Sequence, residues 1–331
     1  MESIAAGARR GPSADALALR RTRRTILVVS LIVLAAAAFA LLRPVPLRPL
    51  ATAVAHVRWE FLPVLLMLAL LHYVCAAVAL RSASGRRLPL ARTTLAQFAA
   101  AAANRVTLGG LGAAAVNTRY LVRHGVPLPR AAVGVAVLHV SGTPTDLLLV
   151  AAVLALGDGD ERMMDALAGH AVRVLDLVTS LPLLLLAGAM VPVAVVWGRR
   201  AVRSAAMRRA AEGFTDLCRR PRDLAVMLTA SAATTFVLGI AFTVSALAVP
   251  GTGAAPGDAV ALVTAYLLGA FAGAAVPAPG GIGSTEAALV ATLTALGVPG
   301  GPALQTVLVF RATTFWAPVP VGLLACRTLC R

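Results

Sequence analysis

Apolar runs divided by arginine-bearing segments make up most of the chain. A bilayer-spanning helix takes about 20 apolar residues. Six runs come close to or exceed that length, and between them they cover residues 26–42, 61–80, 131–156, 175–197, 224–249 and 303–326. The pattern predicts a helical protein that crosses a membrane several times.

Two further apolar stretches are broken by glycines. In the first, residues 94–103 and 113–122 flank "NRVTLGGLG"; in the second, residues 259–276 and 284–296 flank "PAPGGIG". Neither half of the first pair is long enough to cross alone, so we expect a re-entrant hairpin with the glycine turn at its tip. The same holds for the second pair, although residues 259–276 could instead cross fully.

The glycines of the two turns correspond. Gly109, Gly110 and Gly112 of the first turn match Gly280, Gly281 and Gly283 of the second, and "GVP" follows both. Irregular backbone at membrane depth is tolerated only where protein buries it or a watery cavity wets it. The tips are therefore candidates for a polar site inside the membrane.

Composition agrees with a membrane protein. The chain is 59% hydrophobic and 13% charged, with a mean hydropathy of +0.84. Its net charge of +16 could suggest a nucleic-acid binder. The charges lie mostly between the apolar runs and aromatic residues are only 5%, which argues against a nucleic-acid surface.

The arginines predict the topology, because basic loops stay in the cytoplasm. Residues 1–24 read as a disordered basic arm, and the segment 199–222, with eight arginines, reads as a cytoplasmic loop. Residues 26–42 are taken as an uncleaved span; the alternative is a cleaved signal peptide. Both termini are then cytoplasmic in a multi-pass protein of the inner (plasma) membrane.

With this topology the chain divides into two membrane repeats, 25–157 and 171–327. Each reads as two spans, a glycine-tipped hairpin and one more span, and the repeats start from opposite sides. The predicted fold is all-α, a polytopic inverted repeat. Inverted repeats with broken helices meeting near mid-membrane are typical of secondary transporters.

Two long motifs carry a family resemblance. "PAPGGIGSTEAALVATLTALGVP…VLVFRATTFWAPVPVG" and "AAANRVTLGGLGAAAVNTRYLVRHGVPLPRAA" resemble the C- and N-terminal motifs of the lysylphosphatidylglycerol synthase transmembrane-region family. The resemblance implies movement of aminoacylated phosphatidylglycerol or other lipids between leaflets. We expect a stand-alone form without the aminoacyl-transferase domain. Transferred position by position, the family's candidate residues are Asn104, Gly109, Gly110, Gly112, Arg119, Arg123, Gly280, Gly281, Gly283, Glu286, Arg311 and Trp316.

Glu286 and Arg311 are the charged residues that the motifs place at membrane depth. Glu286 lies in the first turn after Gly283, where a carboxylate either complements the helix dipole or forms a headgroup or proton site. Arg311 lies eight residues into the last run and needs a partner, for which Glu286 is the candidate. The pair is either structural or a binding site for a lipid phosphate.

Three more polar residues fall within predicted membrane segments. Asn104 and Arg105 lie at the first hairpin's tip, where they could contact a phosphate. Asp146 follows Pro144 in the run 131–156 and either caps the kink or faces a cavity. We expect all three to line a substrate site together with the glycines of both turns.

The leading hypothesis is a flippase-like lipid translocase for phospholipid or aminoacyl-phospholipid headgroups, and not an enzyme. No cofactor, metal or nucleic acid is expected, and membrane lipids are the expected partners. The alternatives are a membrane subunit of a lipid-modifying enzyme and a lipid-linked transferase. The transferase is less favoured because the sequence has no metal-binding carboxylate pair.

Overall fold

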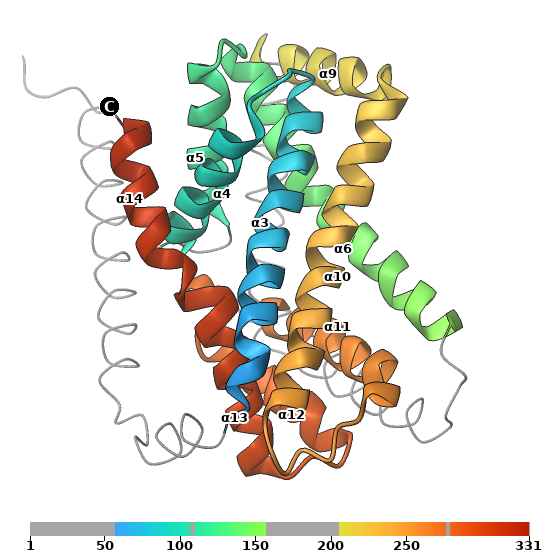
Figure 1. The fold of residues 1–331 in the computed structure, drawn as a ribbon. Helices are drawn as coiled ribbons and strands as arrows, with labels where there is room; N and C mark the ends of the chain where they lie inside the picture. The colour runs from blue at the N-terminus through green and yellow to red at the C-terminus, as the bar shows by residue number, and fades with distance from the viewer. Residues whose placement is uncertain (1–56, 106, 108–109, 157–204, 276–278, 331) are drawn as a thin grey trace, which may run out of the picture. The chain divides into compact units, whose positions relative to one another are not determined.

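The computed structural model describes residues 57–105, 107, 110–156, 205–275 and 279–330, all within one compact unit of the chain. This part is helical and contains no strand (Figure 1). Four of its helices are long and apolar enough to cross a membrane; they cover Trp59–Ser84, Pro221–Ala248, Pro256–Ala274 and Gly300–Ala325. The protein is therefore a multi-pass membrane protein.

Helices α3 (Leu62–Ser84) and α10 (Pro221–Ala248) pack side by side through the described part of the chain (Figure 1). Each has a proline in its first turn, where the missing N–H costs nothing. The α3 helix ends at Gly85, whose φ of 63° is the left-handed conformation typical of a helix C-terminus. Both helices match predicted spans.

The first hairpin consists of α4 (Leu90–Asn104) and α5 (Leu111–Arg123). Buried polar pairs join its arms: Gln97 Nε2 donates to Asn117 Oδ1 at 3.1 Å, and the Thr93 and Tyr120 hydroxyls lie 3.0 Å apart. At the tip, Thr107 donates to the carbonyl of Ala103 and accepts from the N–H of Gly112. A single hydroxyl therefore links the end of α4 to the start of α5.

The second hairpin consists of α11 (Ala259–Ala275) and α12 (Ser284–Ala295). A Cβ atom on Gly269 would stand 3.1 Å from the Leu289 Cα, and one on Gly273 would stand 2.6 Å from the Thr285 Cα. The arms therefore touch where small residues recur every fourth position. Although α11 is long enough to cross, it packs as one arm of a hairpin.

The predicted last span, 303–326, is not one continuous helix. It consists of α13 (Gly300–Arg311), a π-helical turn (Ala312–Trp316) and α14 (Pro318–Cys330). In the π turn, the Ala317 N–H donates to the Ala312 carbonyl at 2.8 Å. Pro318 and Pro320 have no N–H to donate, so the regular ladder is interrupted here. The predicted span is confirmed as the segment Gly300–Ala325, and the π turn within it is a feature that the hydrophobic pattern did not predict.

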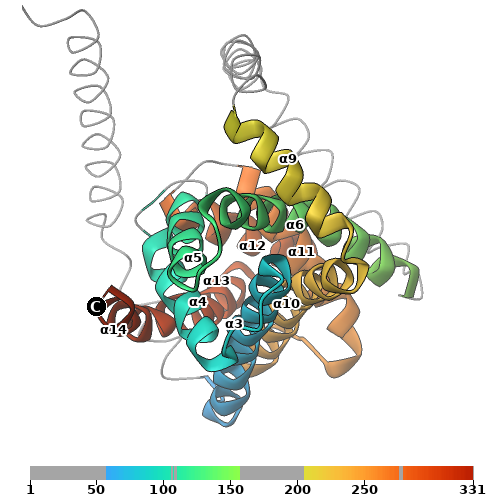
Figure 2. The ribbon, with the colours of Figure 1, turned by 90° about the horizontal axis from the view of Figure 1, so that it is seen from above.

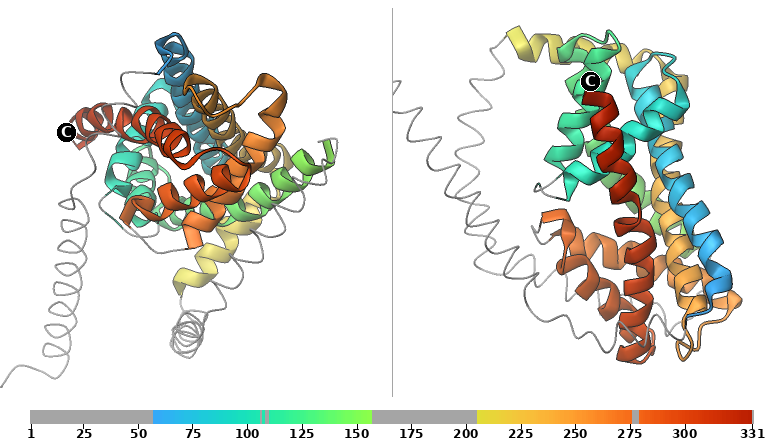
Figure 3. Two further views of the ribbon diagram at one scale, coloured as in Figure 1. Left: turned by 90° about the horizontal axis from the view of Figure 1, so that it is seen from below. Right: turned by 60° about the vertical axis from the view of Figure 1, so that its left-hand side comes forward.

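The two hairpins enter from opposite ends of this unit. The arms α4 and α5 lie at the end crossed by α9 (Ala205–Cys218), and α11 and α12 lie at the other end with α13 (Figures 1 and 3). The first end also holds the C-terminal ends of α3 and α14. Helix α6 (Leu128–Leu156) follows α5 and packs against α9 and α10.

Several predicted elements lie outside the described residues. These are the basic arm 1–24, the first span 26–42, the span 175–197, the first part of the loop 199–222, and Gly109. The inverted repeat as a whole therefore remains a prediction.

Candidate functional site

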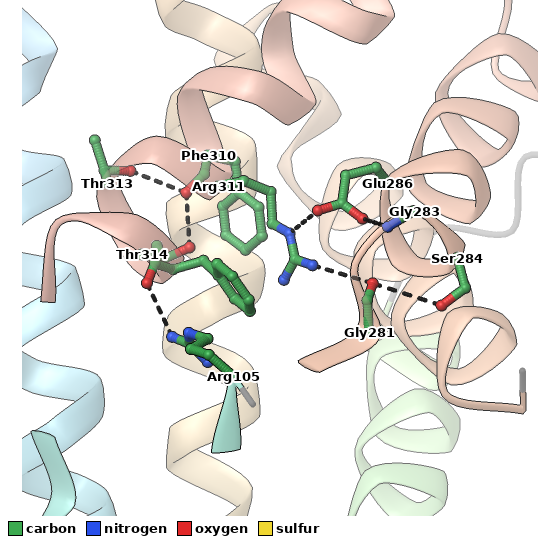
Figure 4. A network of polar contacts seen from close by, with 10 residues as sticks. Arg105, Gly281, Gly283, Ser284, Glu286, Phe310, Arg311, Thr313 and Thr314 are labelled. Atoms are coloured by element: carbon green, nitrogen blue, oxygen red, sulfur yellow. Dashed lines mark hydrogen bonds and ion pairs between the residues drawn. The ribbon is translucent and has the colours of Figure 1, made fainter. Parts of the chain in front are cut away.

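Arg311 and Glu286 form an ion pair at the start of the second hairpin's return arm. Arg311 Nε donates to Glu286 Oε1 at 2.6 Å, and the side chains are 10% and 21% exposed (Figure 4). Arg311 Nη2 also donates to the carbonyl of Gly281 at 3.2 Å. The predicted pairing is confirmed, and its low exposure strengthens it relative to a surface pair.

The carboxylate of Glu286 also accepts a second hydrogen bond. Its Oε2 accepts a hydrogen bond from the N–H of Gly283 at 2.7 Å, so it caps the first turn of α12 (Figure 4). The dipole-complementing role of this residue is therefore present together with the predicted ion pair, whereas the headgroup or proton site stays a prediction. Gly283 has a φ of 88°, which an L-residue rarely adopts.

Phe315, in the π turn, lies between two guanidinium groups. The Arg105 Cζ lies 3.4 Å from the ring centroid and the Arg311 Cζ lies 4.0 Å from it. Two such groups would overlap on one face, so they occupy opposite faces. Each cation is attracted by the negative face of the ring.

Arg105 also bonds to the backbone of the π turn. Its Nη2 donates to the Phe315 carbonyl at 2.9 Å, and Tyr73 on α3 lies near its guanidinium and lines the same cavity. The described residues provide no ion pair to this arginine. It is a half-buried cation held by neutral groups.

The tips of the hairpins meet at Arg105. A Cβ atom on Gly280 would lie 3.3 Å from the Arg105 Cα and 3.4 Å from the Phe315 ring. The φ of Gly280 is 60°, so a side chain is disfavoured both by conformation and by space. The glycine allows the second tip to rest on the backbone of the first.

A cavity of about 270 Å³ lies at this junction, at the small end of the range for ligand sites. Helices α3, α4, α5, α10, α11, α12 and α13 and the π turn contribute to its wall. The polar and aromatic side chains that line it are His72, Tyr73, Gln97, Asn104, Arg105, Tyr266, Thr285, Phe310, Arg311, Thr314 and Phe315.

Two buried polar atoms of this wall lack a hydrogen-bond partner in the described part of the chain. They are Asn104 Oδ1 and Arg105 Nε. Leaving a buried donor or acceptor unpaired costs about 1–3 kcal/mol. Unpaired polar atoms beside a cavity are typical of a site that is completed by a ligand or water.

The structure brings together most of the predicted site residues. Asn104, Arg105 and Arg311 line the cavity, and Glu286, Gly280 and Gly281 contact those residues or their backbone. They come from both halves of the chain.

Asp146 and Gly110 are not in this wall. Asp146, on α6, interacts with Thr235 of α10 and is coupled electrostatically to Tyr266. It is therefore a neighbour of the lining rather than part of it. Gly110 borders a separate apolar groove between α5 and α6, where its missing Cβ would lie 3.4 Å from the His139 ring.

Sequence reasoning missed the aromatic part of the site. Phe315 lies between the two cations, whereas Trp316, which the family motif suggested, is 45% exposed and does not line the cavity. Two prolines within five residues of Phe315 were the available signal, because they predict a break in the helix. The break turns the ring and its carbonyl toward Arg105.

The fold and this cavity define a polytopic helical membrane protein in which two glycine-tipped hairpins meet around buried charge. The family model described as the lysylphosphatidylglycerol synthase TM region matches residues 26–322, and the chain belongs to this family. No curated protein sequence matches the chain.

Proposed function

We propose that the protein is a lipid translocase that passes the headgroup of an anionic or aminoacylated phospholipid through the cavity between the hairpin tips. It acts as a transporter rather than an enzyme. The observation that supports this most directly is the arrangement of Arg105, Phe315 and Arg311, with two cations stacked on one ring at the point where the halves meet.

The charge balance favours an anionic ligand. Glu286 neutralises Arg311, but Arg105 has only neutral partners among the described residues. An arginine at the bilayer centre costs about 2.5–3.5 kcal/mol on the insertion scale. A lipid phosphate would offset that cost and would satisfy the free Nε of Arg105 with a charge-assisted hydrogen bond.

The cavity size favours a headgroup rather than a whole lipid. About 270 Å³ holds a small polar group, so the acyl chains stay in the bilayer. The unpaired Oδ1 of Asn104 offers an acceptor to a hydroxyl or ammonium group of that headgroup. By the positive-inside rule, the α9 end faces the cytoplasm of a plasma membrane.

Leaflet exchange in vesicles tests this proposal. The full chain is reconstituted with fluorescent phosphatidylglycerol, lysyl-phosphatidylglycerol or phosphatidylcholine, and outer-leaflet dye is quenched chemically. We expect the protein to exchange phosphatidylglycerol, lysyl-phosphatidylglycerol or both between leaflets. The Arg105→Gln variant should lose most of this exchange. The matched control is Arg222→Gln, which removes an exposed arginine away from the cavity.

Two results would count against the translocase. One is exchange no faster than in protein-free vesicles for all three lipids. The other is equal exchange in the Arg105→Gln and Arg222→Gln variants when both fold to the same extent.

A further inference from the structure

A second polar cavity, of about 410 Å³, lies at the α9 end of the described unit. Its wall comes from residues 83–86 at the end of α3, residues 126–134 around the start of α6, and residues 213–220 at the end of α9. Along α3, Gly85 is 13 residues beyond His72, or about 20 Å. The cavity is therefore separate from the one between the hairpin tips.

Arginines dominate its lining. Arg86, Arg130, Arg219 and Arg220 face it, with Asp216 as the carboxylate. Arg130 pairs with Asp216 at 2.9 Å, and Arg220 pairs at 3.2 Å with Asp223, which lies just outside. Four positive and two negative charges leave an excess of two positive charges.

That excess lies on Arg86 and Arg219. Both are exposed, and neither forms an ion pair with the described residues. Arg86 Nη1 donates to the carbonyl of His124 at 3.3 Å, which fixes the side chain without neutralising it. Two free guanidinium groups therefore border a cavity in which the other two are already paired.

Glycines leave room for two of these arginines. A Cβ atom on Gly85 would overlap Arg220 Nη1, so a larger residue there would displace this guanidinium from the end of α3. Arg86 Nη1 lies 3.2 Å from the position of a Cβ on Gly125. These arginines also lie just beyond helix C-termini, Arg86 after α3 and Arg219 and Arg220 after α9, where cations are favourable. A helix terminus does not by itself account for a cavity with four arginines in its wall.

The orientation of α9 indicates how deep in the membrane the cavity lies. This helix lies across the end of α3 and α10 rather than along them (Figures 1 and 2). On α9 itself, Leu217 is buried against Ala83 and Met227, while Phe214 is 49% exposed. A helix lying across the bundle end with an exposed aromatic ring is typical of the membrane interface, where lipid phosphates lie.

We propose that this cavity binds the phosphate of an anionic lipid headgroup between Arg86 and Arg219. The planar forks of donors on two arginines match phosphate oxygens, and basic pockets at the membrane surface bind anionic headgroups. A free phosphate ion has the same chemistry, and the experiment separates the two sources. The site does not depend on transport through the central cavity.

The test measures binding to the full chain in detergent micelles at fixed ionic strength. The probes are short-chain phosphatidylglycerol, inorganic phosphate, and a short-chain diacylglycerol that lacks phosphate. Arg86→Gln and Arg219→Gln are compared with Arg87→Gln and Arg222→Gln, which remove exposed neighbouring arginines that do not line the cavity. Repeating the titration in an Arg105→Gln chain removes any contribution of the central cavity.

We expect phosphatidylglycerol to bind and diacylglycerol not to bind. Each cavity variant should weaken binding about tenfold, the loss expected for a charge-assisted hydrogen bond, and the control variants should stay close to the parent. Inorganic phosphate binding as tightly as the lipid would support the phosphate site and assign it to a soluble ion.

The same loss in the cavity and control variants would overturn the proposal in favour of diffuse surface charge, as would the absence of binding by either phosphate probe. If Arg86→Gln fails to fold, as judged by thermal unfolding, Arg219→Gln carries the test, because its side chain makes no ion pair with the described residues.

Discussion

Arg105 and Gly280 are in contact although 175 residues separate them in sequence. The position of a Cβ on Gly280 lies 3.3 Å from the Arg105 Cα and 3.5 Å from its carbonyl oxygen. Because the two residues belong to hairpins that enter from opposite ends, this contact joins the halves of the described unit (Figure 3). Any movement of one tip must therefore change the packing of the other.

Replacing Gly280 by alanine should separate the tips. The left-handed φ of 60° costs an alanine about 1–2 kcal/mol, and the added methyl group presses on backbone that cannot turn away. Gly297→Ala is the matched control, since its φ is 87° and nothing lies within 4 Å of the added Cβ. We expect the apparent Tm to fall further in Gly280→Ala. Equal decreases would contradict a tight contact between the tips.

Glu286 and Arg311 should be strongly coupled. Glu286→Gln keeps an acceptor for the Gly283 N–H but leaves Arg311 as an unpaired, mostly buried cation. Breaking a buried pair in this way costs about 3 kcal/mol or more. In Arg311→Gln it is the Glu286 carboxylate that loses its partner. The double variant should therefore lose less free energy of unfolding than the two single variants lose in sum.

A double-mutant cycle measures this coupling by equilibrium unfolding in mixed micelles. We expect an interaction free energy of about 1–3 kcal/mol. Additive single effects would mean that the 2.6 Å contact contributes no stability of its own.

We expect the two faces of the Phe315 ring, which contact guanidinium groups, to contribute to transport in addition to the volume that the side chain fills. Phe315→Leu removes the ring that both guanidinium groups contact, each contact being worth about 0.5–2 kcal/mol. Phe310→Leu is the control: this residue is also buried and also lines the cavity, but its ring packs on Phe242 and Tyr266.

At matched folded fraction, Phe315→Leu should slow leaflet exchange of anionic lipid more than Phe310→Leu does, and Phe315→Tyr should retain exchange. If the two leucine variants behave alike, the ring acts only as packing volume.

Much of the structure could be predicted from local sequence. The lengths of the apolar runs predicted the bounds of α3, α6 and α10, and the glycine turns between short apolar runs predicted both hairpins to within a few residues. The partner of Arg311 could be predicted because an arginine within an apolar run needs a carboxylate, and Glu286 was available at a comparable depth.

The rest depended on contacts between distant segments. Nothing local indicates that Arg105 stacks on Phe315, because the contact exists only when the π turn faces the first tip. Asp146 was predicted in the lining because charge at membrane depth suggests function, but it lies beside Thr235 of a neighbouring helix and outside the cavity wall. Sequence shows that a charge needs a partner, and the fold determines which one it obtains.

The packing of the last helix, α14, should be sensitive to the size of the side chain at the position of Gly322. A Cβ there would overlap the carbonyl oxygen of Phe98 and stand 2.9 Å from the Ala102 Cβ, so α14 packs directly on the first hairpin. In a helix, glycine to alanine is otherwise favourable by up to about 1 kcal/mol. Gly301→Ala, in α13 with nothing within 4 Å of the new Cβ, should therefore leave the apparent Tm unchanged or raise it. Gly322→Ala should lower the Tm, because the methyl group forces α14 away from α4; a Tm equal to that of Gly301→Ala would show that the two helices do not pack this closely.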